Sequence, residues 1–409
     1  MKRVPGAVVL ALASVVAVGC SPSHRSSTSS GPSMTVRPAS GLLDVPATIS
    51  VSGLRAGTLV TLTAQATDAV GTVWTSTAQF STPASGVISS SDPSVGGSYR
   101  GANAMGLFEL MAPPAAATHD MIFTSPGAVY QVKLTASAGT GIVTSATMDR
   151  DTGTGAAPTP IALRPAVGGL YGEMHPASAT GKHPAVLLFG GSEGGLSGAS
   201  EADLLAAHGY PTLDLAYFGE PGLPTTLANV PLEYFAKALA FLRAQPGVDP
   251  SHVVVMGGSR GGEAALLIGS TYPALVNAVV ASVPSSDVHM GFPDDTQPAW
   301  TLHGVAVPAG NIAVEQIHGP IMLTCGGQDA VWDSCDYVTS ITDRLQRTHF
   351  PYQVTALKYP QAGHAVGAMF AYNSYTASFI AGLGGNLTAN QTAVADAHAH
   401  LLSFLAAQS

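Results

Sequence analysis

The sequence predicts a small antiparallel β-sandwich followed by a larger α/β unit with a mostly parallel sheet. Short runs of Thr, Val and small residues fill the N-terminal part of the chain, as is typical of half-buried strands. Beyond them, apolar strands alternate with helical stretches. Gly, Pro and Thr become dense around residues 151–165 and separate the two patterns. We therefore place the sandwich at residues 34–160 and the α/β unit at residues 161–409.

Composition excludes several classes of protein. Of the 409 residues, 46% are hydrophobic and 10% are charged, so the chain is not a disordered polyelectrolyte. Its 16 Lys and Arg against 25 Asp and Glu give a net charge of -9, which offers a nucleic-acid backbone little to bind. His and Cys residues show no zinc-type spacing. We expect a small-molecule partner and neither a metal nor a cofactor. The sequence does not reveal the oligomeric state.

The N-terminus predicts export. Lys2 and Arg3 precede an apolar run from Val8 to Val18, which has the length of a signal-peptide core and is shorter than the roughly 20 residues of a membrane span. Residues 17–20, Ala-Val-Gly-Cys, resemble the lipobox of bacterial lipoproteins. We expect a signal peptide at residues 1–20 and lipidation of Cys20, with ordinary signal cleavage as the alternative.

A Ser-, Thr- and Pro-rich stretch at residues 21–33 predicts a flexible tether after the lipobox. Every later apolar run is interrupted, so the lipid anchor is the expected membrane contact of a periplasmic or cell-surface protein. An oxidising compartment would permit a disulfide between Cys325 and Cys335, and buried free thiols are the alternative.

The sandwich is predicted from strands and the turns between them. Leu59–Ala64 and Tyr130–Thr135 have strand composition, and Asp68–Gly71 and Ser137–Gly141 have turn composition. Such a succession is typical of an immunoglobulin-like sandwich. This part lacks clustered His, Cys or carboxylate residues, so we assign it no chemistry.

The α/β unit is predicted from alternating elements. The expected strands are residues 185–189, 211–217, 253–256, 321–324 and 353–358, and the expected helices are residues 201–208, 232–243 and 263–272. This alternation indicates parallel strand pairing.

A serine at a strand-to-helix junction is the candidate nucleophile. Residues 257–261, Gly-Gly-Ser-Arg-Gly, match the nucleophile elbow of the α/β hydrolase fold, and residues 190–194 match it as well. In that fold two strand–helix units precede the elbow, and Ser259 has them whereas Ser192 does not. Ser259 would also lie at a helix N-terminus, where the helix dipole favours a developing oxyanion.

The second glycine-rich match predicts the oxyanion hole. A loop after the third strand of the fold supplies one backbone N–H, and the residue after the nucleophile supplies the other. We assign these roles to Gly191 or Ser192 and to Arg260, with a plain turn as the alternative for the loop.

A base and an acid must follow the serine in the order Asp, then His. Asp329 follows the strand at residues 321–324, and His364 follows the last predicted strand. Both positions fall at the edge of the sheet where the elbow lies. Asp333 and Asp336 are competing acids, but they follow Trp332 in a predicted helix.

At these residues the sequence resembles the acyl-CoA thioesterases grouped with bile acid-CoA:amino acid N-acyltransferase. Motifs that carry the resemblance occur in both parts of the chain, in order: Asp68–Ser76, Gly96–Gly101, Met105–Phe108, Leu188–Gly195, Leu215–Phe218 and Gly258–Glu263. The resemblance implies the same triad of Ser259, Asp329 and His364. It also implies acyl transfer to water, since the acyltransferase branch carries Cys at the nucleophile position.

Two segments depart from the family pattern. Glu109 stands where relatives tend to have an aromatic residue, and the segment Asp287–His318, expected to cover the site, matches no family motif.

The expected function is that of an acyl-CoA thioesterase-like serine hydrolase, which releases a fatty acid through an acyl-enzyme. Because acyl-CoA is cytoplasmic and this chain carries an export signal, an exported carboxylesterase or dienelactone-hydrolase-like enzyme is the alternative. A non-catalytic surface binding protein is the second alternative.

Overall fold

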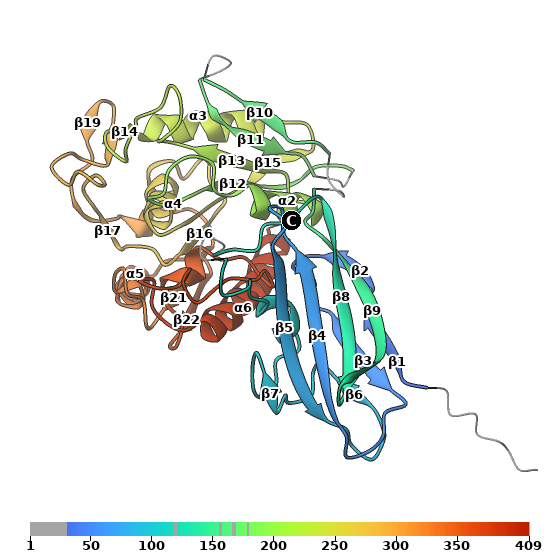
Figure 1. Ribbon diagram of the computed structural model, residues 1–409. Coiled ribbons are helices and arrows are strands. Elements are labelled where there is room, and N and C mark those ends of the chain that lie inside the picture. The colour runs from blue at the N-terminus through green and yellow to red at the C-terminus, as the bar shows by residue number, and fades with distance from the viewer. Residues whose placement is uncertain (1–30, 118–120, 155–157, 166–168, 178–179, 409) are drawn as a thin grey trace, which may run out of the picture.

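The computed structural model describes residues 31–117, 121–154, 158–165, 169–177 and 180–408. The expected signal peptide, Cys20 and most of the tether lie outside the described residues. Figure 1 shows a β-sandwich, drawn in blue to green, beside an α/β part that runs from green to red.

Two sheets form the sandwich: a six-stranded sheet in the order β2-β9-β8-β4-β5-β7 and a three-stranded sheet in the order β1-β3-β6. The strands are β1 (Ser33–Arg37), β2 (Ser40–Leu42), β3 (Thr48–Ser52), β4 (Leu59–Thr67), β5 (Val73–Ser81), β6 (Ile88–Ser89), β7 (Gly96–Gly97), β8 (Val129–Ala138) and β9 (Gly141–Asp151), with the short helix α1 (Gly106–Glu109). One pairing differs from the predicted antiparallel pattern. β2 leaves β1 for the edge of the other sheet and there runs parallel to β9.

The sandwich core follows from strand alternation. In β4 and β5 every second side chain is buried, and these side chains share one core with residues of the three-stranded sheet such as Ile49 and Ile88. Asp68 fixes the predicted turn between β4 and β5, because its carboxylate accepts hydrogen bonds from the Val70 N–H and from the indole N–H of the buried Trp74.

The α/β part contains an eight-stranded sheet in the order β10-β11-β13-β12-β15-β16-β21-β22. Its strands are β10 (Ile161–Leu163), β11 (Tyr171–His175), β12 (His183–Phe189), β13 (Thr212–Ala216), β15 (Val248–Gly258), β16 (Ala278–Ser282), β21 (Ile321–Gly326) and β22 (Val354–Tyr359). β10, β11 and β13 pair antiparallel, and the remaining pairs are parallel. In chain order, β12 with α2 (Ala199–Ala207) and β13 with α3 (Leu232–Arg243) precede β15, which gives the two strand–helix units that the elbow assignment requires.

Helices cover both faces of this sheet. They are α2 (Ala199–Ala207), α3 (Leu232–Arg243), α4 (Arg260–Thr271), α5 (Ser334–Arg347) and α6 (Leu387–Ala406). Short elements complete the part: β14 (Val230–Pro231), β17 (Asp287–Val288), β18 (Trp300–Leu302), β19 (Val305–Ala306), β20 (Gly310–Asn311), η1 (Val314–Gln316) and η2 (His364–Gly367). Within the described ranges no helix is both long and apolar enough to cross a bilayer.

Alternate side chains of β15 enter different cores. Val253 and Val255 pack with α3, α4 and α5, whereas Val254 and Met256 pack with α2 and α6. The predicted third helix begins at Arg260, earlier than expected. Gly261 and Gly262 are helical although glycine disfavours a helix, because almost every residue of α4 is buried and packing outweighs this preference.

The sandwich and the α/β part are joined by backbone pairing. Residues 121–123, from the N-terminal part, run beside residues 374–376: the Phe123 N–H donates to the Ser374 carbonyl over 2.9 Å, and the Thr376 N–H donates to the Met121 carbonyl over 2.9 Å. Asp44 forms a second junction. Its carboxylate accepts hydrogen bonds from His208, just after α2, at 2.7 Å and from His398 of α6 at 2.8 Å.

Asp214, in β13, generates a prediction about pH. Its side chain is buried, and the effect of burial outweighs those of the nearby His175 and of a backbone hydrogen bond from Gly198. Burial raises its pKa from 3.8 to about 7. A raised pKa means that the folded state binds the proton more tightly than the unfolded state, so this group makes the protein less stable as pH rises from about 4 to 7.

We expect Asp214→Asn to remove this loss of stability. Relative to the variant, the wild type should lose up to about 4 kcal/mol of unfolding free energy between pH 4 and pH 8, as a shift of this size implies. Urea unfolding of both proteins across this range measures the difference. Parallel stability curves would contradict the assignment of a protonated Asp214.

Candidate active site

The strand-to-helix turn at Ser259 has a backbone conformation that few residues adopt. Its φ is 55° and its ψ is -121°, and positive φ is uncommon for a residue with a side chain. The Ser259 N–H donates to the Ser282 carbonyl over 2.9 Å, which ties the turn to the neighbouring strand. A Cβ on Gly257 would lie 2.5 Å from the Gly261 carbonyl oxygen, so the close passage of strand and helix requires glycine.

Ser259, His364 and Asp329 form a continuous hydrogen-bonded chain. His364 Nε2 lies 2.9 Å from Ser259 Oγ, and His364 Nδ1 lies 2.8 Å from Asp329 Oδ2. Because a carboxylate faces Nδ1, we assign the imidazole proton to Nδ1, which leaves Nε2 free to accept the hydroxyl proton. The structure therefore brings together the three residues that the sequence singles out, from three separate loops.

Asp329 is held as an anion. Its side chain is 1% exposed. Burial alone would raise its pKa, but the hydrogen bond from His364 and further donors outweigh this effect and lower the pKa below the usual value. Its Oδ1 accepts the backbone N–H of Val331 and of Trp332. The competing acids lie elsewhere: Asp333 occupies the residue before α5, Asp336 lies in the first turn of that helix, and neither has a hydrogen bond to His364.

His364 is fixed from two sides. Its own N–H donates to the Leu383 carbonyl over 2.7 Å, and the preceding Gly363 N–H donates to the Asn390 side chain of α6 over 2.8 Å. The indole of Trp332 meets the imidazole edge-on, with ring centroids 5.7 Å apart. Backbone and ring are thus positioned before any substrate binds.

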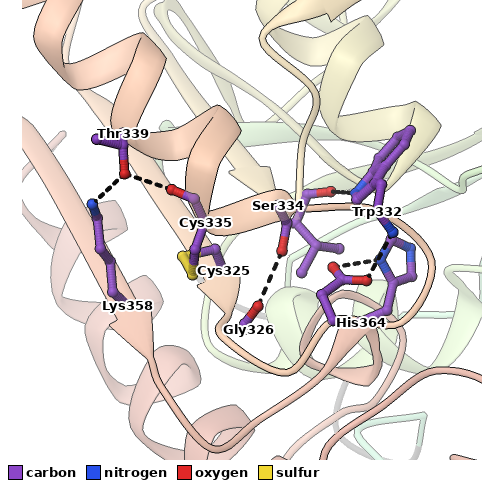
Figure 2. Close-up of a disulfide and its surroundings, with 10 residues drawn as sticks. Cys325, Gly326, Trp332, Ser334, Cys335, Thr339, Lys358 and His364 are labelled. Atoms are coloured by element: carbon purple, nitrogen blue, oxygen red, sulfur yellow. Dashed lines mark hydrogen bonds and ion pairs between the residues drawn. A yellow bond between two sulfur atoms is a disulfide. The ribbon is translucent and has the colours of Figure 1, made fainter.

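A disulfide closes the loop that carries Asp329. Cys325 at the end of β21 is bonded to Cys335 in the first turn of α5, ten residues later. Figure 2 shows this bond on one side of the loop and Trp332 with His364 on the other. The structure thus contains the bridge rather than the free thiols.

The glycine-rich loop lies against Ser259, as predicted for an oxyanion hole. A Cβ on Gly191 would be 3.2 Å from Ser259 Cβ. The hydroxyl of Tyr217, which directly follows β13, donates to the Gly191 carbonyl over 2.8 Å and thereby fixes the loop. The backbone N–H groups of Ser192 and Arg260 have no hydrogen-bond partner among the described residues. They are therefore available to an incoming oxygen.

Gly191 differs in one respect from its predicted role. Its N–H donates to Glu193 Oε1 over 2.8 Å, and the same oxygen accepts the Ser197 hydroxyl at 2.9 Å. The protein's own carboxylate therefore occupies this donor. Glu193 is not among the predicted site residues, although its carboxylate stands inside the glycine-rich motif at residues 190–194.

A cavity of about 650 Å³ opens beside Ser259 and His364. Its walls come from the carboxyl ends of the central strands, from α2, from α6 and from residues 366–383. Ile122 completes the lining from the N-terminal part of the chain. The segment that includes the sandwich, to which we assigned no chemistry, thus contributes to the wall of the site.

The segment Asp287–His318 does not cover this cavity, contrary to expectation. None of its residues belongs to the lining. Instead it is anchored on α4, because the buried Glu263 carboxylate accepts the Trp300 indole N–H at 2.7 Å and the His289 N–H at 3.1 Å. Arg260 Nε lies 3.0 Å from the other oxygen of Glu263, so the Arg260 side chain points into this network.

The Asp44 cluster has the residue types of a metal site. Asp44, His208 and His398 place their ligand atoms within 4.8 Å of one another. Each imidazole nitrogen is, however, at hydrogen-bonding distance from the same carboxylate oxygen, 2.7 and 2.8 Å. Ligands of one tetrahedral zinc ion would be roughly 3.3 Å apart. We interpret the cluster as a hydrogen-bonded junction.

Two protein-family models match the chain, one in each part. The N-terminal region model of the acyl-CoA thioester hydrolase/BAAT family matches residues 44–154. The BAAT/acyl-CoA thioester hydrolase C-terminal model matches residues 230–298 and 300–408. Together the two models account for more than half of the sequence.

Two curated proteins and one solved structure illustrate what the chain is similar to. Acyl-coenzyme A amino acid N-acyltransferase 2 of Mus musculus is 27% identical over 376 residues, which cover 84% of this chain and 88% of that protein. Acyl-coenzyme A thioesterase 6 of the same organism is 30% identical over 213 residues, 46% of this chain and about half (49%) of its own length. Among solved structures, a dienelactone hydrolase-like promiscuous phosphotriesterase from metagenomic libraries superposes with a TM-score of 0.39 at 19% identity and covers 61% of this chain and 98% of its own.

The disulfide generates a prediction about stability. Replacing both cysteines, Cys325→Ala with Cys335→Ala, should lower the free energy of unfolding by about 3 kcal/mol, because the unfolded chain regains the entropy of a closed loop. Urea unfolding measures this change. Reductant should destabilise the wild type to the level of the double variant and leave the variant unaffected. Equal stability of both proteins in oxidising buffer would refute the prediction.

Proposed function

The chain belongs to the acyl-CoA thioester hydrolase/BAAT family, and on that premise we propose that it hydrolyses an acyl thioester through a serine acyl-enzyme. One observation carries the proposal: the hydrogen-bonded chain from Ser259 through His364 to Asp329 ends at a cavity large enough for an acyl group. The two matching family models support the substrate class.

Acylation begins at the serine hydroxyl. His364 Nε2 takes the proton of Ser259 Oγ as the oxygen attacks the acyl carbonyl, and Asp329 stabilises the imidazolium that forms. The carbonyl oxygen becomes an oxyanion. It accepts the Arg260 N–H at the start of α4 and an N–H from the loop, either that of Ser192 or that of Gly191 once Glu193 releases it.

Acylation ends when His364 gives its proton to the leaving thiolate, and the thiol departs while the acyl group remains on Ser259. In deacylation, water takes the place of the thiol, and His364 removes its proton as the water oxygen attacks the acyl carbonyl. His364 then returns this proton to Ser259 Oγ as the bond to the acyl group breaks, and the carboxylic acid is released. Serine as nucleophile fits transfer to water, which is the thioesterase outcome within this family.

We also propose where the enzyme is located in the cell. The basic residues and apolar run at the N-terminus, followed by a lipobox-like Cys20, support export and a lipid anchor at the cell surface or in the periplasm. In that compartment the acyl donor is a thioester or a related ester that occurs outside the cytoplasm.

We expect Ser259→Ala to reduce kcat/KM by at least about 1,000-fold on the best substrate of an acyl-CoA chain-length series, because loss of the nucleophile removes the acyl-enzyme route. Residues 34–409 serve as the wild type. Ser403→Ala, an exposed serine on α6, is the matched control and should retain full activity. A parallel series of p-nitrophenyl esters compares thioesters with oxygen esters.

The outcomes separate the three candidate functions. Faster turnover of thioesters supports the proposal, whereas exclusive turnover of oxygen esters identifies a carboxylesterase. If the wild type is inert on both series and does not react with a fluorophosphonate probe, the proposal that the protein is an enzyme fails. A non-catalytic binding protein is then the remaining candidate.

A further inference from the structure

The cavity beside Ser259 has a polar corner that the hydrolytic mechanism does not use. Ser200 and Glu201 of α2 and His398 of α6 line it together with apolar side chains. We propose that the acyl group accepted here carries a hydroxyl on its chain, which Glu201 and His398 bind. This inference rests on the proposed function and specifies its substrate class.

The apolar wall indicates where the chain of the acyl group lies. Leu188, Met256, Val280 and Met322 belong to β12, β15, β16 and β21, and all line the cavity shortly before their strands end. They are on the face of the sheet that α2 and α6 cover. Val394 and Leu401 of α6 line the other side. An acyl chain attached at Ser259 therefore runs from the sheet edge into the space between sheet and helices, toward the polar corner.

Glu201 has no partner of its own. It is partly buried and lines the cavity, yet it has no hydrogen bond or ion pair with any residue that the structure describes. Burial raises its pKa, the nearby His398 opposes this rise, and the Asp44 carboxylate adds to it. A carboxyl group facing an apolar cavity is costly unless a ligand supplies a partner. Glu201 lies in the first turn of α2, where the helix dipole favours a carboxylate, and its carboxyl group still offers a hydrogen-bonding site to a ligand in the cavity.

His398 is only half engaged. Its Nε2 is bound to Asp44 Oδ2, and its Nδ1 has no partner within the described residues. Burial opposes a charge on the ring, but the hydrogen bond to Asp44 and the two nearby carboxylates outweigh it and raise the pKa. The corner therefore presents an acceptor, Glu201, beside an imidazole that already has a carboxylate partner.

These features favour a hydroxyl over the other groups that an acyl chain could carry. An unsubstituted alkyl chain would leave Glu201 without a partner. An ammonium group would meet Glu201 but also the ring of His398, in which Asp44 favours positive charge. A hydroxyl both donates and accepts, and it is neutral, so it can be desolvated at the lowest cost.

The test compares acyl-CoA thioesters of equal chain length with and without a hydroxyl, the hydroxyl being moved along the chain. We expect one hydroxyacyl isomer to exceed its unsubstituted counterpart at least about tenfold in kcat/KM, because the site otherwise keeps an unpaired polar group. Glu201→Leu should abolish or reverse that preference. Glu201→Gln, which keeps size and hydrogen bonding, should retain most of it.

Two controls keep folding and function apart. Glu173→Leu, on β11 and outside the cavity lining, should leave the preference unchanged. Calorimetric binding of hydroxy and unsubstituted fatty acids to Ser259→Ala provides a readout that needs no turnover, and Glu201→Leu in that background should remove the difference.

Each result decides the inference. Equal rates and equal binding at every hydroxyl position would overturn it, as would a preference that survives Glu201→Leu. A stronger preference for an amino-substituted chain would overturn the proposal of a hydroxyl group and would indicate that the site binds a cation. If no thioester is hydrolysed, the proposed function fails, while the binding comparison still tests the hydroxyl site on its own.

Discussion

The turn at Ser259 is the constraint around which the α/β part is arranged. A side chain at positive φ is unfavourable, so the surroundings must fix it: the Ser282 carbonyl holds its N–H, and α4 continues directly from it. The approach is so close that a Cβ on Gly261 would lie 2.3 Å from the Gly190 carbonyl oxygen. The same contact brings the glycine-rich loop against the nucleophile. Strain at one residue and placement of the oxyanion loop are thus one structural feature.

The sandwich takes part in this arrangement through a buried cation. Arg150 is fully buried and donates to the carbonyls of Leu43 and Val45, which flank Asp44. Arg150 thereby fixes the turn that presents Asp44 to His208 and His398. His208 comes directly after α2 and His398 lies in α6, and these two helices form walls of the cavity. The position of the acyl site therefore depends on a residue of the N-terminal part.

Sequence reasoning succeeded where local pattern determines structure. Helix α3 has the predicted bounds, Leu232–Arg243, because apolar residues recur at helical spacing and Pro231 precedes it. The loops with Ser259, Asp329 and His364 converge because parallel strands end at one edge of the sheet. Contacts between distant segments left no such signal. Ile122 enters the cavity only because residues 121–123 pair with residues 374–376, and no periodicity encodes that pairing.

Glu193 gives the oxyanion site a property of its own. Its carboxylate holds the Gly191 N–H at 2.8 Å, so a negative group already fills part of the place where negative charge develops. A substrate carbonyl gains this donor only by displacing Glu193, and the exchange is most favourable when the oxygen is most negative, in the tetrahedral intermediate. The carboxylate product competes for the Gly191 N–H less well than Glu193 does, because Glu193 is tethered to the loop and loses no binding entropy when it returns. The loop therefore favours the transition state over the product, as hydrolytic turnover requires.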